Sequence, residues 1–110
     1  MSQLFFMIIE IFLLKRMLME VIVKVFANLR DICGGVTVEV QPKGNRVIDV
    51  LDKMIMMFPD LEEEIFTAEK QLKPFVAVYI NGRNIIHAND LQTEVLDTDQ
   101  FALFPPVAGG

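Results

Sequence analysis

Residues 75–80 and the dipeptide that follows them constrain the fold of this chain more than any other stretch. The run Phe-Val-Ala-Val-Tyr-Ile has almost no polar residue, which is typical of a strand buried on both faces, or nearly so, at the centre of a sheet. Asn81-Gly82 follows at once and is the strongest two-residue signal for a β-hairpin, since both residues tolerate a positive φ. Residues 83–86 are therefore expected to start the return strand.

Three further strands are predicted from their side-chain patterns. Residues 21–26 are rich in β-branched side chains, and residues 36–40 alternate apolar and polar side chains. Gly34-Gly35 lies between them and predicts the turn of an opening strand pair. A short apolar run at residues 101–104 predicts the last strand.

Two helices are predicted between the first strand pair and residue 75. Asn45 is a suitable N-cap for a helix whose apolar residues recur every three or four positions up to Phe58, where Pro59 ends it. Asp60 and Glu63 resemble a capping box for a short second helix to about residue 68. The whole order predicts an α+β fold, in which a mixed sheet of four to five strands carries one main helix across one face and a short second helix.

The composition restricts the partners and the compartment. The chain has 110 residues, of which 53% are hydrophobic and 23% charged, so it predicts one folded domain. Its net charge of −5 argues against a nucleic-acid partner, because phosphate binding needs clustered Lys and Arg, and favours basic protein surfaces. Cys33 is the only cysteine, so no internal disulfide can form, and we expect a reducing compartment, the cytoplasm.

The usual catalytic and metal-binding constellations are missing from the sequence. Cys33 and His87 are separated by a predicted helix and several strands, so we interpret Cys33 as a small loop hydrophobe and His87 as a hairpin residue. Neither metal-ligand spacing nor a phosphate-binding loop occurs. We therefore expect no metal site and no catalytic centre within this chain.

The first 19 residues stand apart from the pattern of the domain. Residues 3–14 are apolar except for Gln3 and Glu10, and this run is too short for a spanning helix, which needs ~20 apolar residues. They also lack the features of a secretory signal. Three interpretations remain open: a helix that packs on the domain or on another copy, a weak membrane-surface anchor, or translated sequence upstream of a start at Met17 or Met19.

The C-terminal tail, residues 105–110, carries the candidate reactive group. It reads Pro105, Pro106, Val107, Ala108, Gly109 and Gly110. The two glycines have no side chain, so a narrow channel in another protein can close around them, and the prolines keep their segment extended. At ~3.3 Å per residue these six residues reach about 20 Å. We divide the chain into an extension (1–19), a domain (20–104) and this tail (105–110).

The strands and the tail together resemble the MoaD/ThiS type of ubiquitin-like sulfur carrier, which includes the molybdopterin synthase small subunit. Residues 23–30 are similar to the first strand and loop of that family, and residues 78–82 to its central hairpin. The family's segment leading to the tail is similar to residues 96–104. Its tail is similar to the terminal Pro-Pro-Val-Ala-Gly-Gly. The resemblance covers roughly residues 20–110 and implies a β-grasp fold.

The resemblance also implies a sulfur carrier for molybdopterin biosynthesis. An E1-like (MoeB-like) adenylating enzyme would activate the carboxylate of Gly110 with ATP, and sulfur transfer would then make it a thiocarboxylate. The large molybdopterin synthase subunit (MoaE-like) would receive the tail in its active site. The chain would bind no cofactor and would act as a co-substrate, with the catalytic groups on its partners.

The last strand is also expected to take part in docking. Phe101, Leu103 and Phe104 are predicted to help dock both partners, since the sheet face away from the helix must be covered by something. Related carriers with similar tails serve thiamin synthesis, tRNA thiolation or conjugation to lysines, and these roles stay open. An alternative of another class is a membrane-associated interaction module that uses residues 3–14.

Overall fold

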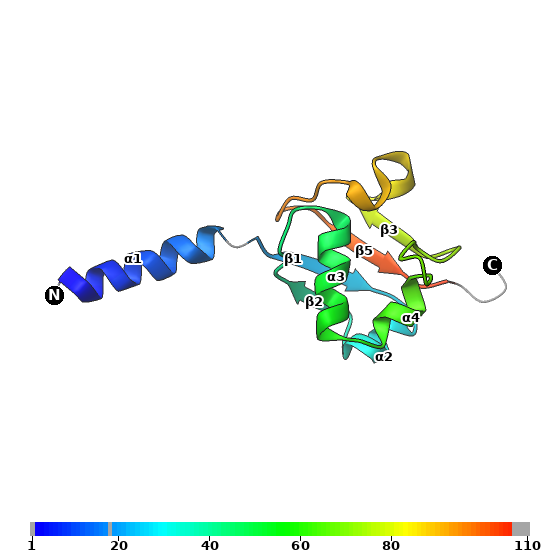
Figure 1. Cartoon of the computed structure of the whole chain (residues 1–110), viewed down its shortest axis with the longest axis horizontal. Helices are drawn as coiled ribbons and strands as arrows, with labels where there is room; N and C mark the ends of the chain where they lie inside the picture. The colour runs from blue at the N-terminus through cyan, green and yellow to red at the C-terminus, as the bar shows by residue number, and fades with distance from the viewer. Residues whose placement is uncertain (1, 18, 107–110) are drawn as a thin grey trace.

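A mixed sheet forms the centre of the domain (Figure 1). The computed structural model describes residues 2–17 and 19–106, and within them the sheet has five strands. The strands are β1 (Val21–Val25), β2 (Thr37–Val40), β3 (Ala77–Ile80), β4 (Arg83–Asn84) and β5 (Phe101–Phe104). The helices are α1 (Ser2–Met17), α2 (Leu29–Cys33), α3 (Val47–Met57) and α4 (Leu61–Ile65), and η1 (Ile85–His87) and η2 (Asp90–Gln92) are 3-10 turns.

The strand order across the sheet is β2-β1-β5-β3-β4. β1 pairs antiparallel with β2 and parallel with β5, and β5 pairs antiparallel with β3. The central strand is therefore β5, and the prediction that residues 75–80 form the central strand is wrong. Phe75 and Val76 lie in a turn before β3, so β3 begins only at Ala77 and lies next to the edge strand β4.

α3 crosses one face of the sheet and provides much of the core (Figure 1). Its buried side chains recur every three or four residues, as the sequence predicts, and are Val47, Val50, Leu51 and Met54. The helix ends at Met57 with Phe58 as its C-cap, because Pro59 disfavours helical geometry in the residue before it.

The start of α3 differs from the prediction by one residue. The N-cap is Arg46 and not Asn45, and the backbone N–H of Arg46 donates to Oδ2 of Asp49 at 3.0 Å. The carboxylate of Asp49 lies close against Gly44, where a Cβ would overlap it. A glycine at this position therefore lets an acidic residue in the first turn cap the helix.

The two short helices α2 and α4 differ from the prediction. The segment before the predicted turn at Gly34-Gly35 contains α2, which ends at Cys33 with Gly34 as its C-cap in the left-handed conformation. α4 ends at Ile65 and not near residue 68, and the side chain of its N-cap, Asp60, makes no capping hydrogen bond. Helices of five residues are too short for apolar periodicity to define them.

The hairpin at Asn81-Gly82 is confirmed. Asn81 and Gly82 both have positive φ, 53° and 80°, and Ile80 pairs with Arg83 across the turn. The return strand is shorter than predicted, because the side chain of Asn84 accepts a hydrogen bond from the backbone N–H of Ile86 and starts η1.

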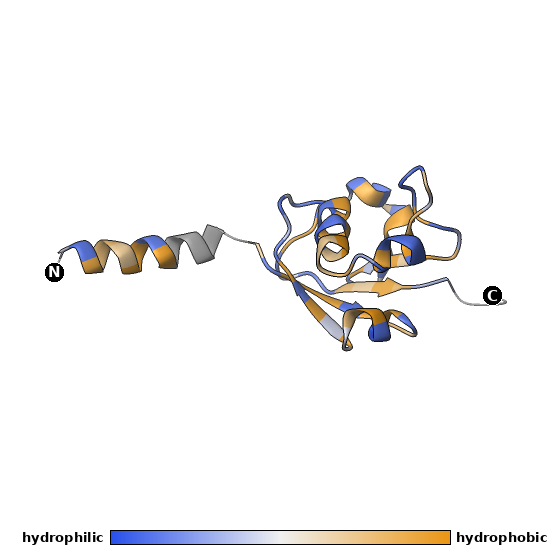
Figure 2. Ribbon diagram, turned by 60° about the horizontal axis from the view of Figure 1, so that its bottom comes forward, coloured by the Kyte–Doolittle hydropathy of each residue, from blue (hydrophilic) through white to orange (hydrophobic). Residues whose placement is uncertain are grey.

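α1 extends away from the domain on the side where β1 begins (Figure 1 and Figure 2). Its apolar side chains are not confined to one face, and the large ones are 55–64% exposed at Leu4, Phe5, Phe6, Met7, Ile8 and Ile11. Within the part of the chain that the structure describes, no helix has the length and apolar character needed to cross a membrane.

Candidate functional site

The predicted reactive tail leaves the domain from the end of the central strand. β5 ends at Phe104, Pro105 is buried and Pro106 is half-buried. Val107, Ala108, Gly109 and Gly110 lie outside the described residues, so the structure defines the root of the tail and not its reactive end.

A stack of side chains holds the last residue of β5 and is called here the tail-root stack: Phe26, Arg30, Tyr79 and Phe104. The rings of Phe104 and Phe26 are parallel within 11°, with centroids 4.2 Å apart. Tyr79 meets Phe104 edge to face, at 5.6 Å. The guanidinium carbon of Arg30 lies 5.3 Å from the centroid of the Phe26 ring, in a cation–π contact. Aromatic pairs of this geometry are worth about 0.5–1.5 kcal/mol beyond the area that they bury, so the stack restrains the direction in which the chain enters the tail.

The path of residues 25–30 explains how Arg30 reaches the stack. Ala27 has a φ of 52°, which turns the chain directly from β1 into α2. Leu29 is buried and anchors α2, and Nε of Arg30 donates to the backbone oxygen of Val25 at 3.1 Å. In the sequence, Ile22, Lys24 and Phe26 alternate with Val21, Val23 and Val25, but this alternation does not identify Phe104 as the partner of Phe26.

The two sides of β5 have different roles. Phe101 and Leu103 are fully buried in the core between the sheet and α3, so their side chains cannot contact a docked protein, and their predicted docking role is corrected. Successive residues of a strand point to opposite faces, so Ala102 and Phe104 lie on the other face, where both are half-buried. The docking role of Phe104 stays a prediction.

The face opposite α3 is called here the open face, and it adjoins the tail-root stack. Register across β3, β5, β1 and β2 places Tyr79, Ala102, Lys24 and Thr37 in one row. Ile22 is 52% exposed beside this row, and a shallow groove of about 470 Å³ runs between β1, β5 and residues 97–100. This face therefore carries an exposed apolar residue and a lysine at one end and the root of the tail at the other, which makes it suited to protein contact.

The structure brings no catalytic constellation together in the residues that it describes. Cys33 ends α2 near β1 and β2, whereas His87 lies in η1 beside β3, toward the other edge of the sheet. Burial raises the pKa of the Cys33 thiol, so the thiol stays protonated and unreactive at neutral pH. No group of three His, Cys, Asp or Glu side chains within residues 2–17 and 19–106 is placed to hold a metal ion.

Comparison with protein families and curated proteins gives consistent matches. The ThiS family matches residues 23–110. The small archaeal modifier protein 1 of Haloferax volcanii is 35% identical over 88 residues, which are 79% of this chain and 97% of that protein. A protein of Archaeoglobus fulgidus that is named for a sulfur-carrier role is 42% identical over 48 residues, and this match spans 44% of the chain and 54% of the relative.

Solved structures agree with the fold. The small archaeal modifier protein 1 of Methanosarcina acetivorans superimposes with a TM-score of 0.71 at 36% identity, covering 84% of this chain and 98% of that one. A Pyrococcus furiosus protein named as molybdopterin converting factor, subunit 1, has a TM-score of 0.63 at 29% identity, covering 81% and 99%. The β-grasp, ubiquitin-like fold expected from the sequence is confirmed.

Proposed function

Because the chain belongs to the ThiS family of ubiquitin-like sulfur carriers, we propose that it carries sulfur for molybdopterin synthesis as a thiocarboxylate on Gly110. A carboxylate is a poor electrophile, and adenylation by an E1-like enzyme with ATP gives it a good leaving group. A sulfur nucleophile then replaces AMP at the carbonyl carbon. The large synthase subunit receives the tail and uses the sulfur, so both active sites belong to the partners. The carrier acts in the cytoplasm.

The observation that carries this proposal is the position of the tail root. The central strand ends in the tail-root stack, directly beside the open face, so a partner docked on that face stands next to the point where the tail starts. Six residues from Pro105 reach about 20 Å, which is enough to enter a deep pocket in such a partner. Docking and delivery of the tail can therefore occur in one complex.

The proposal is tested by intact mass after incubation with an adenylating enzyme, ATP and a sulfur donor. We expect the mass increase that corresponds to replacing one carboxylate oxygen with sulfur. Adding the large synthase subunit and the molybdopterin precursor should then return the chain to its carboxylate form. A thiocarboxylate that forms on the chain but is not consumed in this second step would exclude the molybdopterin role.

A second candidate function is conjugation to proteins through Gly110. The similarity to small archaeal modifier protein 1, which extends over 97% of that relative, favours it. In this case the activated carbonyl is attacked by the amine of a lysine and AMP leaves. The same incubation with cell extract should then give isopeptide-linked adducts of higher mass, which a pure sulfur carrier does not form.

Both partners are expected to dock on the open face and to compete for it. Ile22→Ser removes an exposed apolar side chain from this face and should weaken the binding of the adenylating enzyme and of the large subunit by about five- to tenfold each. Met56→Ser is the control, because Met56 is 64% exposed but lies on α3. Simultaneous binding of both partners to one chain without loss of affinity would contradict the shared surface.

The two prolines are expected to differ in their effects. Pro106→Gly should leave stability unchanged and weaken partner binding by up to ~1 kcal/mol, because a less restricted tail loses more conformational entropy when it is bound. Pro105 is buried, so Pro105→Gly should also lower the free energy of unfolding, by about 1–2 kcal/mol. Urea denaturation and calorimetric titration with the large subunit measure the two effects. Equal stability of both variants would show that Pro105 is not part of the fold.

A further inference from the structure

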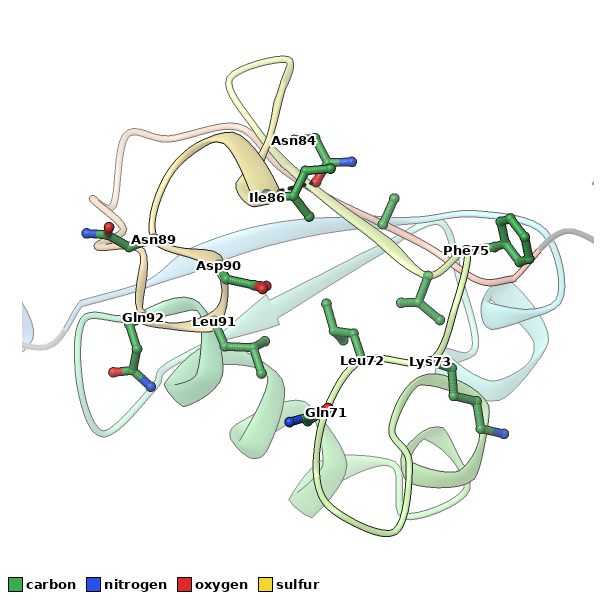
Figure 3. A pocket seen from close by; sticks show the side chains of 12 residues that line it. Gln71, Leu72, Lys73, Phe75, Asn84, Ile86, Asn89, Asp90, Leu91 and Gln92 are labelled. Atoms are coloured by element: carbon green, nitrogen blue, oxygen red, sulfur yellow. Dashed lines mark hydrogen bonds between the residues drawn. The ribbon is translucent and has the colours of Figure 1, made fainter.

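A second groove, lined by both apolar and polar side chains, lies at the edge of the sheet (Figure 3). Its volume is about 650 Å³, and it separates the loop before β3 from η1 and η2. The side chains of Leu72, Leu91 and Ile86 point into the same space, and Phe75 stands at one end (Figure 3). Phe75 and Ile86 are 72% and 63% exposed, and together they form an exposed apolar surface at the groove.

Phe75 is held at this groove in a strained conformation. The backbone N–H of Val76 donates to the oxygen of Lys73 at 3.1 Å and closes a turn with Pro74 and Phe75 as its central residues. Phe75 has a φ of 70°, which the third position of a type II turn requires and which Gly or Asn normally supplies. A phenylalanine that is both strained and exposed gives nothing to the stability of the free domain, and strain of this kind points to a binding role.

The described part of the chain also contains an apolar element without a partner. α1 is a preformed helix, and Leu4, Ile8 and Ile11 are exposed at positions i, i+4 and i+7 along one side of it. This spacing is that of a helix laid into a groove, although Phe5, Phe6 and Met7 are equally exposed on the other sides of α1. The C-terminal tail is a weaker candidate for the groove, because beyond Pro106 it offers only the side chains of Val107 and Ala108.

The groove and the attachment of α1 lie at opposite ends of the sheet. Ala77 pairs with Phe104, so Phe75 is near the tail end, whereas α1 joins at Val21, the start of β1, which runs parallel to β5. Val21 lies about 13 Å along β1 from Val25, the partner of Leu103. α1 extends away from its own groove (Figure 1), so the α1 that reaches a groove belongs to another copy.

We propose that two copies of this chain associate by placing α1 of each in the groove of the other. Leu4, Ile8 and Ile11 would cover Leu72, Phe75 and Ile86. A footprint of ~24 Å by ~10 Å on each contacting surface, in two symmetric contacts, buries on the order of 1,000 Å² in total, which is the lower limit for a specific interface. This inference does not depend on the proposed function.

The first test is sedimentation velocity of the full chain over micromolar concentrations, where we expect a dimer. Ile8→Glu and Ile86→Glu should each raise the dissociation constant by at least ~100-fold, because a carboxylate would be buried among apolar groups. Met56→Glu changes an equally exposed residue outside both surfaces and should leave the dimer intact. A wild-type chain that is monomeric throughout would overturn the proposal.

Phe75→Gly separates binding from folding. It relieves the strained turn, so the melting temperature should rise or stay constant while the dimer weakens by at least ~10-fold. Full dimerisation of Phe75→Gly would contradict the arrangement.

Cysteine cross-linking identifies the occupant of the groove. An Ile8→Cys chain mixed with an Ile86→Cys chain should give a disulfide-linked pair, and Ile22→Cys in place of Ile86→Cys should not. Efficient linkage between two Ile8→Cys chains would show that the helices pair with each other. Loss of the dimer on removing residues 107–110, or binding of the wild-type chain to phosphatidylglycerol vesicles in place of dimerisation, would equally overturn the proposal.

Discussion

Deletion of Gly110 is expected to abolish thiocarboxylate formation completely and to leave the melting temperature unchanged. The proposed chemistry takes place on the carboxylate of Gly110, and the variant ends one residue, ~3.3 Å, too short to reach the same position in the adenylating site. The fold should not respond, because the last buried residue within the described part of the chain is Pro105, five residues before Gly110. Intact mass after the activation reaction and a thermal melt measure the two effects.

Gly110→Ala is the matched variant, because it keeps the length of the tail and adds one methyl group. We expect its rate of activation to fall by about 10²-fold or more if the partner's channel closes tightly around the backbone. A melting temperature lowered by several degrees in the deletion variant would correspond to about 1 kcal/mol and would show that the tail is structural. Sulfur incorporation on a chain that ends at Gly109 would place the reactive carboxylate elsewhere than proposed.

Phe101→Ala is expected to destabilise the domain by about 3–5 kcal/mol, a large part of the 5–15 kcal/mol typical of a small domain. Phe101 is the largest fully buried side chain, and it lies on the central strand, paired with Val23 on one side and Ile80 on the other. Its removal leaves a cavity that neither neighbouring strand can fill without giving up its own pairing. Urea denaturation followed by circular dichroism measures the loss.

Phe104→Ala, three residues along the same strand, provides the comparison. Phe104 is only half-buried, so its loss should cost about 1–2 kcal/mol, mainly the stacking on Phe26 and the contact with Tyr79. Because the variant stays folded, its binding to the adenylating enzyme and to the large subunit can be measured directly. Equal destabilisation by the two substitutions would contradict the assignment of Phe101 to the core and Phe104 to the open face.

The sequence alone determined the features that depend on neighbouring residues. The hairpin at Asn81-Gly82 was predicted because positive φ at two successive positions is a local requirement that few residue types meet. The span of α3 and its end before Pro59 followed from a spacing of three and four and from a steric clash within one dipeptide. The tail was recognised from residue types alone, and its resemblance to the ThiS family was confirmed by the match over residues 23–110.

Which strands pair and which side chains pack together could be seen only in the tertiary structure. Alternation along a strand shows which side chains face the core and does not say which strand lies beside it, so β5 was not recognised as the central strand. For the same reason Phe101 and Leu103 were assigned to a docking surface, and the stacking of Phe26 on Phe104, from the first and last strand regions, was not foreseen. Phe75 was read as part of a strand, because an apolar side chain carries no sign that its backbone will adopt a positive φ. The pairing of strands and the backbone conformation at Phe75 depend on the burial of the whole core. That burial comes from contacts between residues far apart in the chain, and its free energy can outweigh the local conformational preference of a single residue.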